Sequence, residues 1–82
     1  MAQFKHPFGN EEEVVHIGDM TCENRTDRIS LYGSCDITRD QQGLEQALQL
    51  YSLLQGVIAS LEGQQLPEHI SIEQPVKMNS PL

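Results

Sequence analysis

Besides scattered carboxylates, the side chains of this chain that could ligate a metal ion are those of Cys22, Cys35, His6, His16 and His69. Half of a structural zinc site is normally built from two such residues about two to four positions apart. No pair here has that spacing. We therefore predict no metal and no cofactor, and we expect the histidines to be surface or partly packed residues.

Groups that could carry out nucleophilic catalysis are equally isolated. The segment Tyr32-Gly33-Ser34-Cys35 lacks the Gly-x-Ser-x-Gly spacing of a nucleophile elbow, and the chain has no glycine-rich phosphate loop. Neither cysteine can be placed beside a histidine, a lysine or a helix start that would activate a thiol. We expect Cys22 and Cys35 to be free thiols in the core, and the protein not to be an enzyme.

The charge of the chain limits its partners. With 12 acidic and 5 basic residues among 82, the net charge is −7. Binding to nucleic acid needs clustered Lys and Arg that neutralise phosphates, so we expect no nucleic-acid partner. Anionic membranes repel an acidic chain, no apolar run approaches the roughly 20 residues that span a bilayer, and no signal peptide is recognisable. We therefore expect a cytoplasmic protein without membrane contact.

The elements that must position these residues begin after a polar segment. Residues 1–13 have no helical or strand period and include three consecutive glutamates, which predicts a mobile N-terminal lead-in. Its apolar residues, Phe4 and Phe8, could dock on the core, but a frayed terminus is the main expectation.

Residues 14–37 have the pattern of β-strands. From Ile29 to Ile37, apolar and small residues at odd positions alternate with polar residues, as in a half-buried strand. The polar cluster at 23–27 predicts the turn of a hairpin. Residues 14–17 are out of phase with the strand that follows them, so we expect a separate short strand there.

The hairpin register can be predicted from its apolar residues. Pairing Glu23 with Arg28 sets Cys22 opposite Ile29 and places the apolar side chains of both strands on one face. A shift by one residue would turn half of them toward solvent.

Residues 40–63 have the 3.6-residue period of one long helix. Asp40 is the predicted N-cap, with Thr38 as its rival, and Gly63 marks the C-terminal end. Counted from Leu44, the apolar side chains span roughly 220° of the helix circumference, whereas a helix resting on one layer needs about 100°. The surplus predicts a second surface that the rest of the chain is too short to supply.

A second copy of the chain is the covering surface that we expect. A chain of this size often needs a partner to bury enough apolar area. The predicted dimer interface follows two heptad positions of the helix and consists of Leu44, Tyr51, Leu54, Ile58 and Leu61.

Two further segments leave alternatives open. Ser52, Gly56 and Ser60 form a ridge of small residues away from the apolar arc, where we expect a solvated face, the alternative being close approach of another segment. Residues 64–82 contain Pro67, Pro75 and Pro81 and form a tail or arm, either with a short edge strand near 69–73 or disordered.

The predicted fold is α+β: a β-hairpin or three-stranded antiparallel sheet packed on one long helix in the C-terminal half, completed by homodimerisation. The core domain covers residues 14–63. The function that fits is a non-catalytic, homodimeric protein-binding or accessory protein. The alternative is an acidic inhibitor or nucleic-acid mimic that occupies a basic groove on another protein.

The best candidate surface for an unidentified protein partner is the outward side of the hairpin. Basic and aromatic groups gather there on an otherwise acidic chain, and such groups dominate protein interfaces. The predicted partner-binding face consists of Arg25, Arg28, Tyr32 and Arg39.

Overall fold

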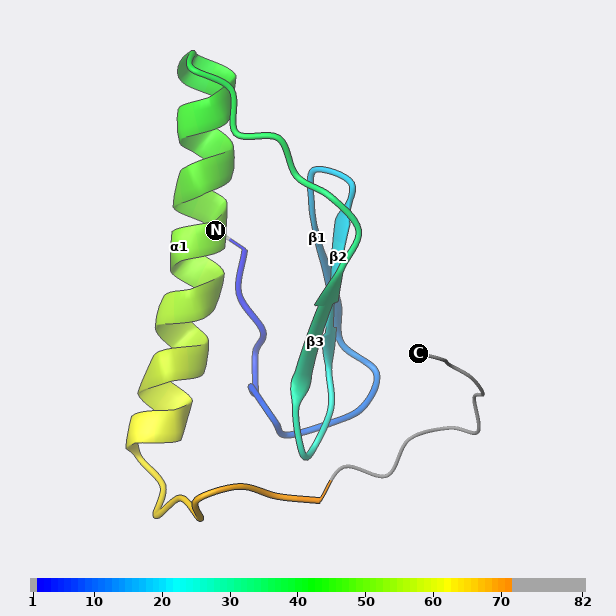
Figure 1. Cartoon of the computed structure of the whole chain (residues 1–82), viewed down its shortest axis with the longest axis vertical. Helices are drawn as coiled ribbons and strands as arrows, with labels where there is room; N and C mark the ends of the chain where they lie inside the picture. Colours follow the sequence, from blue (N-terminus) through cyan, green and yellow to red (C-terminus); the bar gives the residue numbers. More distant parts are fainter. Residues whose placement is uncertain (1, 72–82) are drawn as a thin grey trace.

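Three antiparallel strands are followed by one long helix. The structure, a computed structural model, describes residues 2–71 of the chain. The elements are β1 (Val14–Ile17), β2 (Met20–Asn24), β3 (Ile29–Tyr32) and α1 (Gln41–Glu62). The sheet has the strand order β1-β2-β3, and α1 runs alongside it (Figure 1). This confirms the predicted α+β arrangement, including the separate short strand at Val14–Ile17.

The ends of α1 are set by the residues that the sequence indicates. The Asp40 side chain accepts a hydrogen bond from the Gly43 backbone N–H at 2.8 Å, which satisfies one of the free N–H groups of the first turn. The rival residue Thr38 supports this cap, because its hydroxyl donates to Asp40 Oδ1 at 2.6 Å. At the other end Gly63 follows the last helical residue as C-cap.

The β2–β3 register differs from the predicted one by two residues. Glu23 lies opposite Ser30 and Cys22 opposite Leu31. The Arg25 N–H donates to the Arg28 carbonyl at 3.0 Å, so only two residues form the tip of the turn. Because side chains alternate with a period of two, a two-residue shift keeps every side chain on its predicted face, so the apolar pattern cannot distinguish the two registers.

β3 is shorter than the alternating pattern suggests. It ends at Tyr32, and Gly33 then adopts a φ of 94°, a left-handed conformation that glycine tolerates readily. A Cβ at Gly33 would lie 2.6 Å from the Asp19 carbonyl oxygen, so a side chain could not fit there. Leu31 and Ile37, which we expected on the buried face, are 44% and 52% exposed. Leu31 is exposed because α1 packs mainly against β1, and Ile37 is exposed because the chain leaves the sheet before it.

The core is small and lies between the sheet, α1 and the N-terminal segment. Its buried apolar side chains are Phe4, Ile17, Cys22 and Leu53. One comes from the lead-in, two from the sheet and one from the helix. The N-terminal segment is therefore part of the core rather than an appendage.

Asn24 of β2 ties this N-terminal segment to the sheet. Its side chain is 1% exposed, accepts a 2.7 Å hydrogen bond from the Phe8 N–H and donates a 2.8 Å bond to the His6 carbonyl. A third, 3.3 Å bond goes from Asn24 Nδ2 to Asn10 Oδ1. The expectation of a frayed lead-in is thus wrong for Phe4, and the reason is a buried amide whose partners lie far away in the sequence.

Two residues of the small-residue ridge of α1, Ser52 and Gly56, lie beside this segment. Ser52 is buried, and its carbonyl oxygen accepts a 3.4 Å hydrogen bond from Gln3 Nε2. Gln3 is also the nearest neighbour that a Cβ on Gly56 would meet. The prediction of a solvated face is wrong at Ser52, where the alternative of close approach holds.

Both cysteines are free thiols, as predicted. Cys22 is buried on β2, and this burial raises the pKa of its thiol, with a smaller contribution from the nearby Cys35. Cys35 lies on the segment after β3, not on the strand, and its thiol donates to Gln46 Oε1 at 2.9 Å.

The segment after α1 carries no strand within residues 64–71, and all of these residues are exposed. The remainder of the predicted tail, with Pro75 and Pro81, lies outside the described residues. In the part of the chain that the structure covers, no helix has the length and apolar character needed to cross a membrane.

Candidate functional site

One side of α1 presents large apolar side chains to solvent. Leu53 and its neighbours Leu50 and Val57 take the opposite side and face the core. The outward side chains recur along the whole helix and are 39–61% exposed; this apolar stripe consists of Leu44, Leu48, Tyr51, Leu54 and Ile58.

The stripe contains four of the five residues predicted as a dimer interface. The fifth, Leu61, is half-buried at the edge of the stripe, and Leu48 joins it although we did not predict it as an interface residue. The sequence signal for Leu48 was its place within the 220° arc. The wide arc thus divides into a face that packs on the molecule and a face that does not.

The C-terminal half of the stripe is hollowed into a shallow groove. Its volume is about 410 Å³, and Tyr51, Leu54 and Ile58 lie along it with Gln55, Ala59 and Glu62. The Gln55 amide donates to the Tyr51 hydroxyl at 3.4 Å, so the polar atoms at this place are partly engaged with each other. An apolar side chain from another surface could fill the groove between Tyr51, Leu54 and Ile58.

The stripe is free of charge along most of its length. No charged residue occurs between Glu45 and Glu62 in a chain whose net charge is −7. An apolar, uncharged strip of this kind on an acidic protein favours association with an apolar surface over solvation.

The outward face of the β2–β3 hairpin holds a small polar cluster. Glu23 accepts a 2.7 Å hydrogen bond from the Tyr32 hydroxyl through one carboxylate oxygen and forms a 2.9 Å ion pair with Arg25 through the other. The bond from Tyr32, followed by the charge of Arg25, lowers the pKa of Glu23, and the same bond raises the pKa of Tyr32. Arg25 and Tyr32 are thus brought together by a residue that we did not predict.

The other two predicted partner-binding residues lie apart from this cluster. Arg28 pairs with its neighbour Asp27 at 3.1 Å in the turn. Arg39 precedes α1, which begins at the end of the molecule opposite the β2–β3 turn (Figure 1). The four predicted residues therefore do not form one continuous face.

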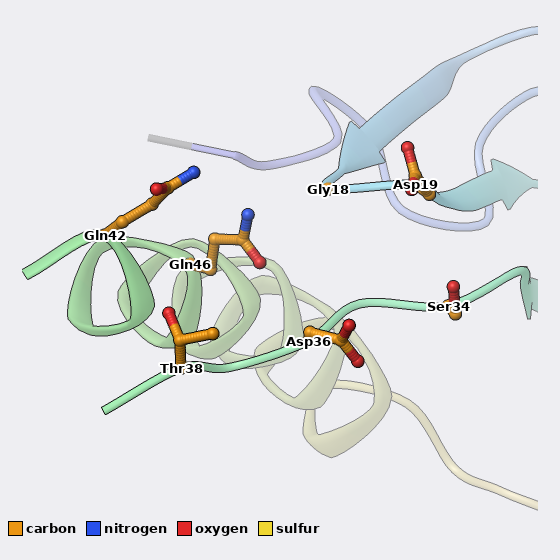
Figure 2. Close-up of a pocket in the computed structure, with 7 residues that line it drawn as sticks. All are labelled: Gly18, Asp19, Ser34, Asp36, Thr38, Gln42 and Gln46. Atoms are coloured by element: carbon orange, nitrogen blue, oxygen red, sulfur yellow. The ribbon is translucent and has the colours of Figure 1, made fainter. Parts of the chain in front are cut away.

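A polar pocket of about 290 Å³ lies where the β1–β2 turn, the segment after β3 and the first turns of α1 meet. Figure 2 shows its carboxylates, hydroxyls and carboxamides, which belong to Asp19, Ser34, Asp36, Thr38, Gln42 and Gln46. We did not predict this pocket, because the alternating pattern carried the strand through Ser34. The one available signal was Gly33, whose conformation ends the strand.

The pocket has two carboxylates, Asp19 and Asp36. Its carboxylates belong to two separate segments, and within residues 2–71 no three His, Cys, Asp or Glu side chains are grouped so that they could hold a metal ion. Its carboxylate, hydroxyl and carboxamide oxygens can accept hydrogen bonds from a polar ligand.

Comparison with protein-family models, with curated proteins and with solved structures finds no match to this chain.

Proposed function

We propose that this protein is a non-catalytic accessory protein that acts as a homodimer and binds another protein. The observation that carries the proposal is the apolar stripe of α1, which is exposed and uncharged between Glu45 and Glu62 and runs along a helix longer than any strand within residues 2–71. A second copy supplies a surface of identical length and chemistry.

The size of the stripe fits a weak to moderate dimer. A fully exposed large apolar side chain presents on the order of 200 Å², so five residues that are 39–61% exposed offer roughly 500 Å². With flanking residues this reaches about 600 Å² per protomer, the lower end of specific interfaces. We therefore expect a dissociation constant in the micromolar range.

Charge also favours a second copy over a basic partner at this surface. A basic protein would be attracted by carboxylates, but the stripe has none between Glu45 and Glu62. Two copies can approach through the stripe without bringing their acidic residues into contact at its centre. Repulsion between two acidic chains is therefore weaker at the stripe than at a surface that carries carboxylates.

Sedimentation equilibrium and light scattering test the proposal. At tens of micromolar we expect a mass near twice 9.2 kDa. Ile58→Glu and Tyr51→Glu should each yield a monomer, because an introduced carboxylate would be buried without a partner. Gln65→Glu adds the same charge at an exposed residue outside the stripe and should remain a dimer.

Folding must be followed in the same samples. Far-ultraviolet circular dichroism should show that both stripe variants keep the helix, since Ile58 and Tyr51 are exposed in the isolated chain. A wild-type protein that sediments as a monomer up to several hundred micromolar would overturn the homodimer.

The hairpin cluster is the surface that we propose for the protein partner. Tyr32 is 52% exposed beside Arg25, and both residue types are common at the centres of interfaces. Tyr32→Ala should leave the dimer mass unchanged and weaken capture of the partner from the native host. Thr21→Ala, on the strand position paired with Tyr32, is the matched control. Equal capture by wild type and Tyr32→Ala would place the partner-binding surface elsewhere.

The alternative of an acidic mimic finds less support. Several acidic side chains already accept hydrogen bonds from their own chain: Glu13 from the Lys5 N–H, Glu11 from the Thr26 hydroxyl, and Glu23 from the Tyr32 hydroxyl. A mimic of nucleic acid needs carboxylates in a regular row that are free for a basic partner.

A further inference from the structure

We infer that the two helices of the dimer are antiparallel, with the two-fold axis at Tyr51 and with Arg39 of each copy beside Glu62 of the other. This inference depends on the proposed homodimer and specifies its geometry. It follows from the spacing of the stripe residues and from the charges at the two ends of α1.

The spacing of the stripe fits a two-fold axis at its middle. In a symmetric dimer, a contact of one residue with a second implies the reciprocal contact. Tyr51 lies midway in sequence between Leu44 and Ile58, which are both more than half exposed. An antiparallel pairing centred on Tyr51 therefore matches Leu44 with Ile58 at both ends of the interface.

The C-terminal end of α1 lacks a charge that would complement the helix dipole, whereas the N-terminal end is capped by the Asp40 carboxylate. Within α1 no acidic residue occupies the first turn and no basic residue occupies the last turn, where Glu62 has an unfavourable charge. The N-terminus of a helix carries a partial positive charge and the C-terminus a partial negative charge. The C-terminal end would be stabilised by a positive charge that its own helix does not provide.

An antiparallel partner supplies the charge that is missing at the C-terminal end. With the axis at Tyr51, position 62 of one copy lies opposite position 40 of the other, so Arg39, just before that helix, lies beside the partner's Glu62. The Asp40 carboxylate at the same place is already engaged by the Gly43 N–H and the Thr38 hydroxyl of its own chain. Arg39 is exposed and forms neither of the ion pairs found among the described residues. The two-fold axis produces this arrangement twice per dimer.

A parallel pairing would have the opposite electrostatics. It would place Glu62 beside Glu62 and Arg39 beside Arg39, and it would align the two helix dipoles in the same direction. The apolar stripe alone permits either direction, so the charged ends decide between them.

Charge reversal tests the proposed contact. Arg39→Glu and Glu62→Arg should each raise the dissociation constant roughly tenfold, because each variant places like charges together at two sites per dimer. The double variant restores opposite charges and should return to within about threefold of wild type. Lys5→Glu and Glu12→Arg make the same charge changes at exposed residues of the lead-in and are the matched controls.

Disulfide trapping tests the direction independently. In a Cys35→Ser background, which keeps a hydrogen donor for Gln46, an equimolar mixture of Leu44→Cys and Ile58→Cys should cross-link on oxidation. Each variant alone should cross-link poorly, since its two thiols lie about 20 Å apart along the helix axis.

The outcomes separate this inference from the proposed function. A monomeric wild-type protein would refute both the homodimer and its antiparallel geometry. A wild-type dimer in which Leu44→Cys cross-links efficiently with itself, or in which the double charge variant is weaker than both single variants, would overturn the antiparallel geometry and leave the homodimer intact.

Discussion

Replacing Asn24 offers the sharpest test of how the N-terminal segment is held. The Asn24 amide is almost completely buried and bonds to the Phe8 N–H, the His6 carbonyl and Asn10 Oδ1. Phe8 itself has a φ of 67°, a conformation that costs a non-glycine residue free energy unless its surroundings impose it. The amide therefore fixes a strained segment whose neighbour Phe4 completes the core.

The expected cost of Asn24→Ala follows from these bonds. The two short bonds, at 2.7 and 2.8 Å, each contribute about 1 kcal/mol, and the backbone groups that lose their partner add a desolvation cost. Together we expect a loss of about 2–4 kcal/mol in the free energy of unfolding. For a chain of this length the total is on the order of 4–12 kcal/mol, so the loss is a large fraction of it.

Asn24→Asp separates the hydrogen bonds from the shape of the side chain. The acid keeps an oxygen for the Phe8 N–H, but it places a second oxygen against the His6 carbonyl and Asn10 Oδ1, which are both acceptors. Burial and these acceptors should raise the pKa of the introduced carboxyl above its usual value of about 3.9. The folded variant then binds the proton more tightly than the unfolded chain, so its stability should fall as the pH rises through that raised pKa.

Urea denaturation at fixed protein concentration measures both effects. The difference in stability between Asn24→Asp and wild type should be small below about pH 4 and large at pH 7. Gln65→Glu, an exposed carboxamide with the same substitution chemistry, should show no such dependence. A loss below about 1 kcal/mol for Asn24→Ala, with no pH dependence for Asn24→Asp, would refute the role assigned to this amide.

Three further changes test the remaining structure. Gly43→Ala should destabilise the protein by more than about 2 kcal/mol in urea denaturation, because its Cβ would overlap the backbone of Thr38; unchanged stability would mean that the segment before α1 is placed differently. Leu53→Ala, at a residue that is 1% exposed, should lower the free energy of unfolding by about 2–5 kcal/mol. A loss under about 1 kcal/mol would show that Leu53 is not a core residue. Hydrogen bonds hold the pKa of Asp40 and Glu13 below their ordinary values of 3.8 and 4.5, so the folded state binds fewer protons than the unfolded chain at acidic pH. The melting temperature should therefore be steady above about pH 5 and decline below about pH 4.5. A melting temperature that rises toward acidic pH would contradict the assigned bonds.

The helix was predictable from the sequence because its determinants are local. The 3.6-residue period, the Asp40 side chain and Gly63 all act within a few residues of where they stand, and the structure places α1 between those caps. The width of the apolar arc also follows from residue order alone. It indicated that one side of the helix would exceed what the sheet covers, as the exposed Leu44 and Ile58 now show.

What the sequence could not predict depends on contacts between distant residues. The β2–β3 register is set by a turn with Thr26 and Asp27 at its tip. The alternation of apolar residues does not distinguish this register from one shifted by two residues. Asn24 has no apolar signal, yet it is buried because the lead-in supplies its partners. The polar pocket exists because the chain leaves the sheet after Gly33, and a periodic pattern does not reveal where a strand ends.

The small core and the apolar stripe have a common consequence for stability. The chain buries only a few apolar side chains, while the helix that anchors Leu53 in the core exposes the stripe on its other side. Covering the stripe therefore stabilises the same helix that completes the core, and dissociation and unfolding should be coupled. Since a partner that binds only the folded state stabilises it by mass action, the wild-type melting temperature should rise with protein concentration. For Ile58→Glu, which cannot cover the stripe, the melting temperature should be independent of concentration, because its folding no longer includes an association step.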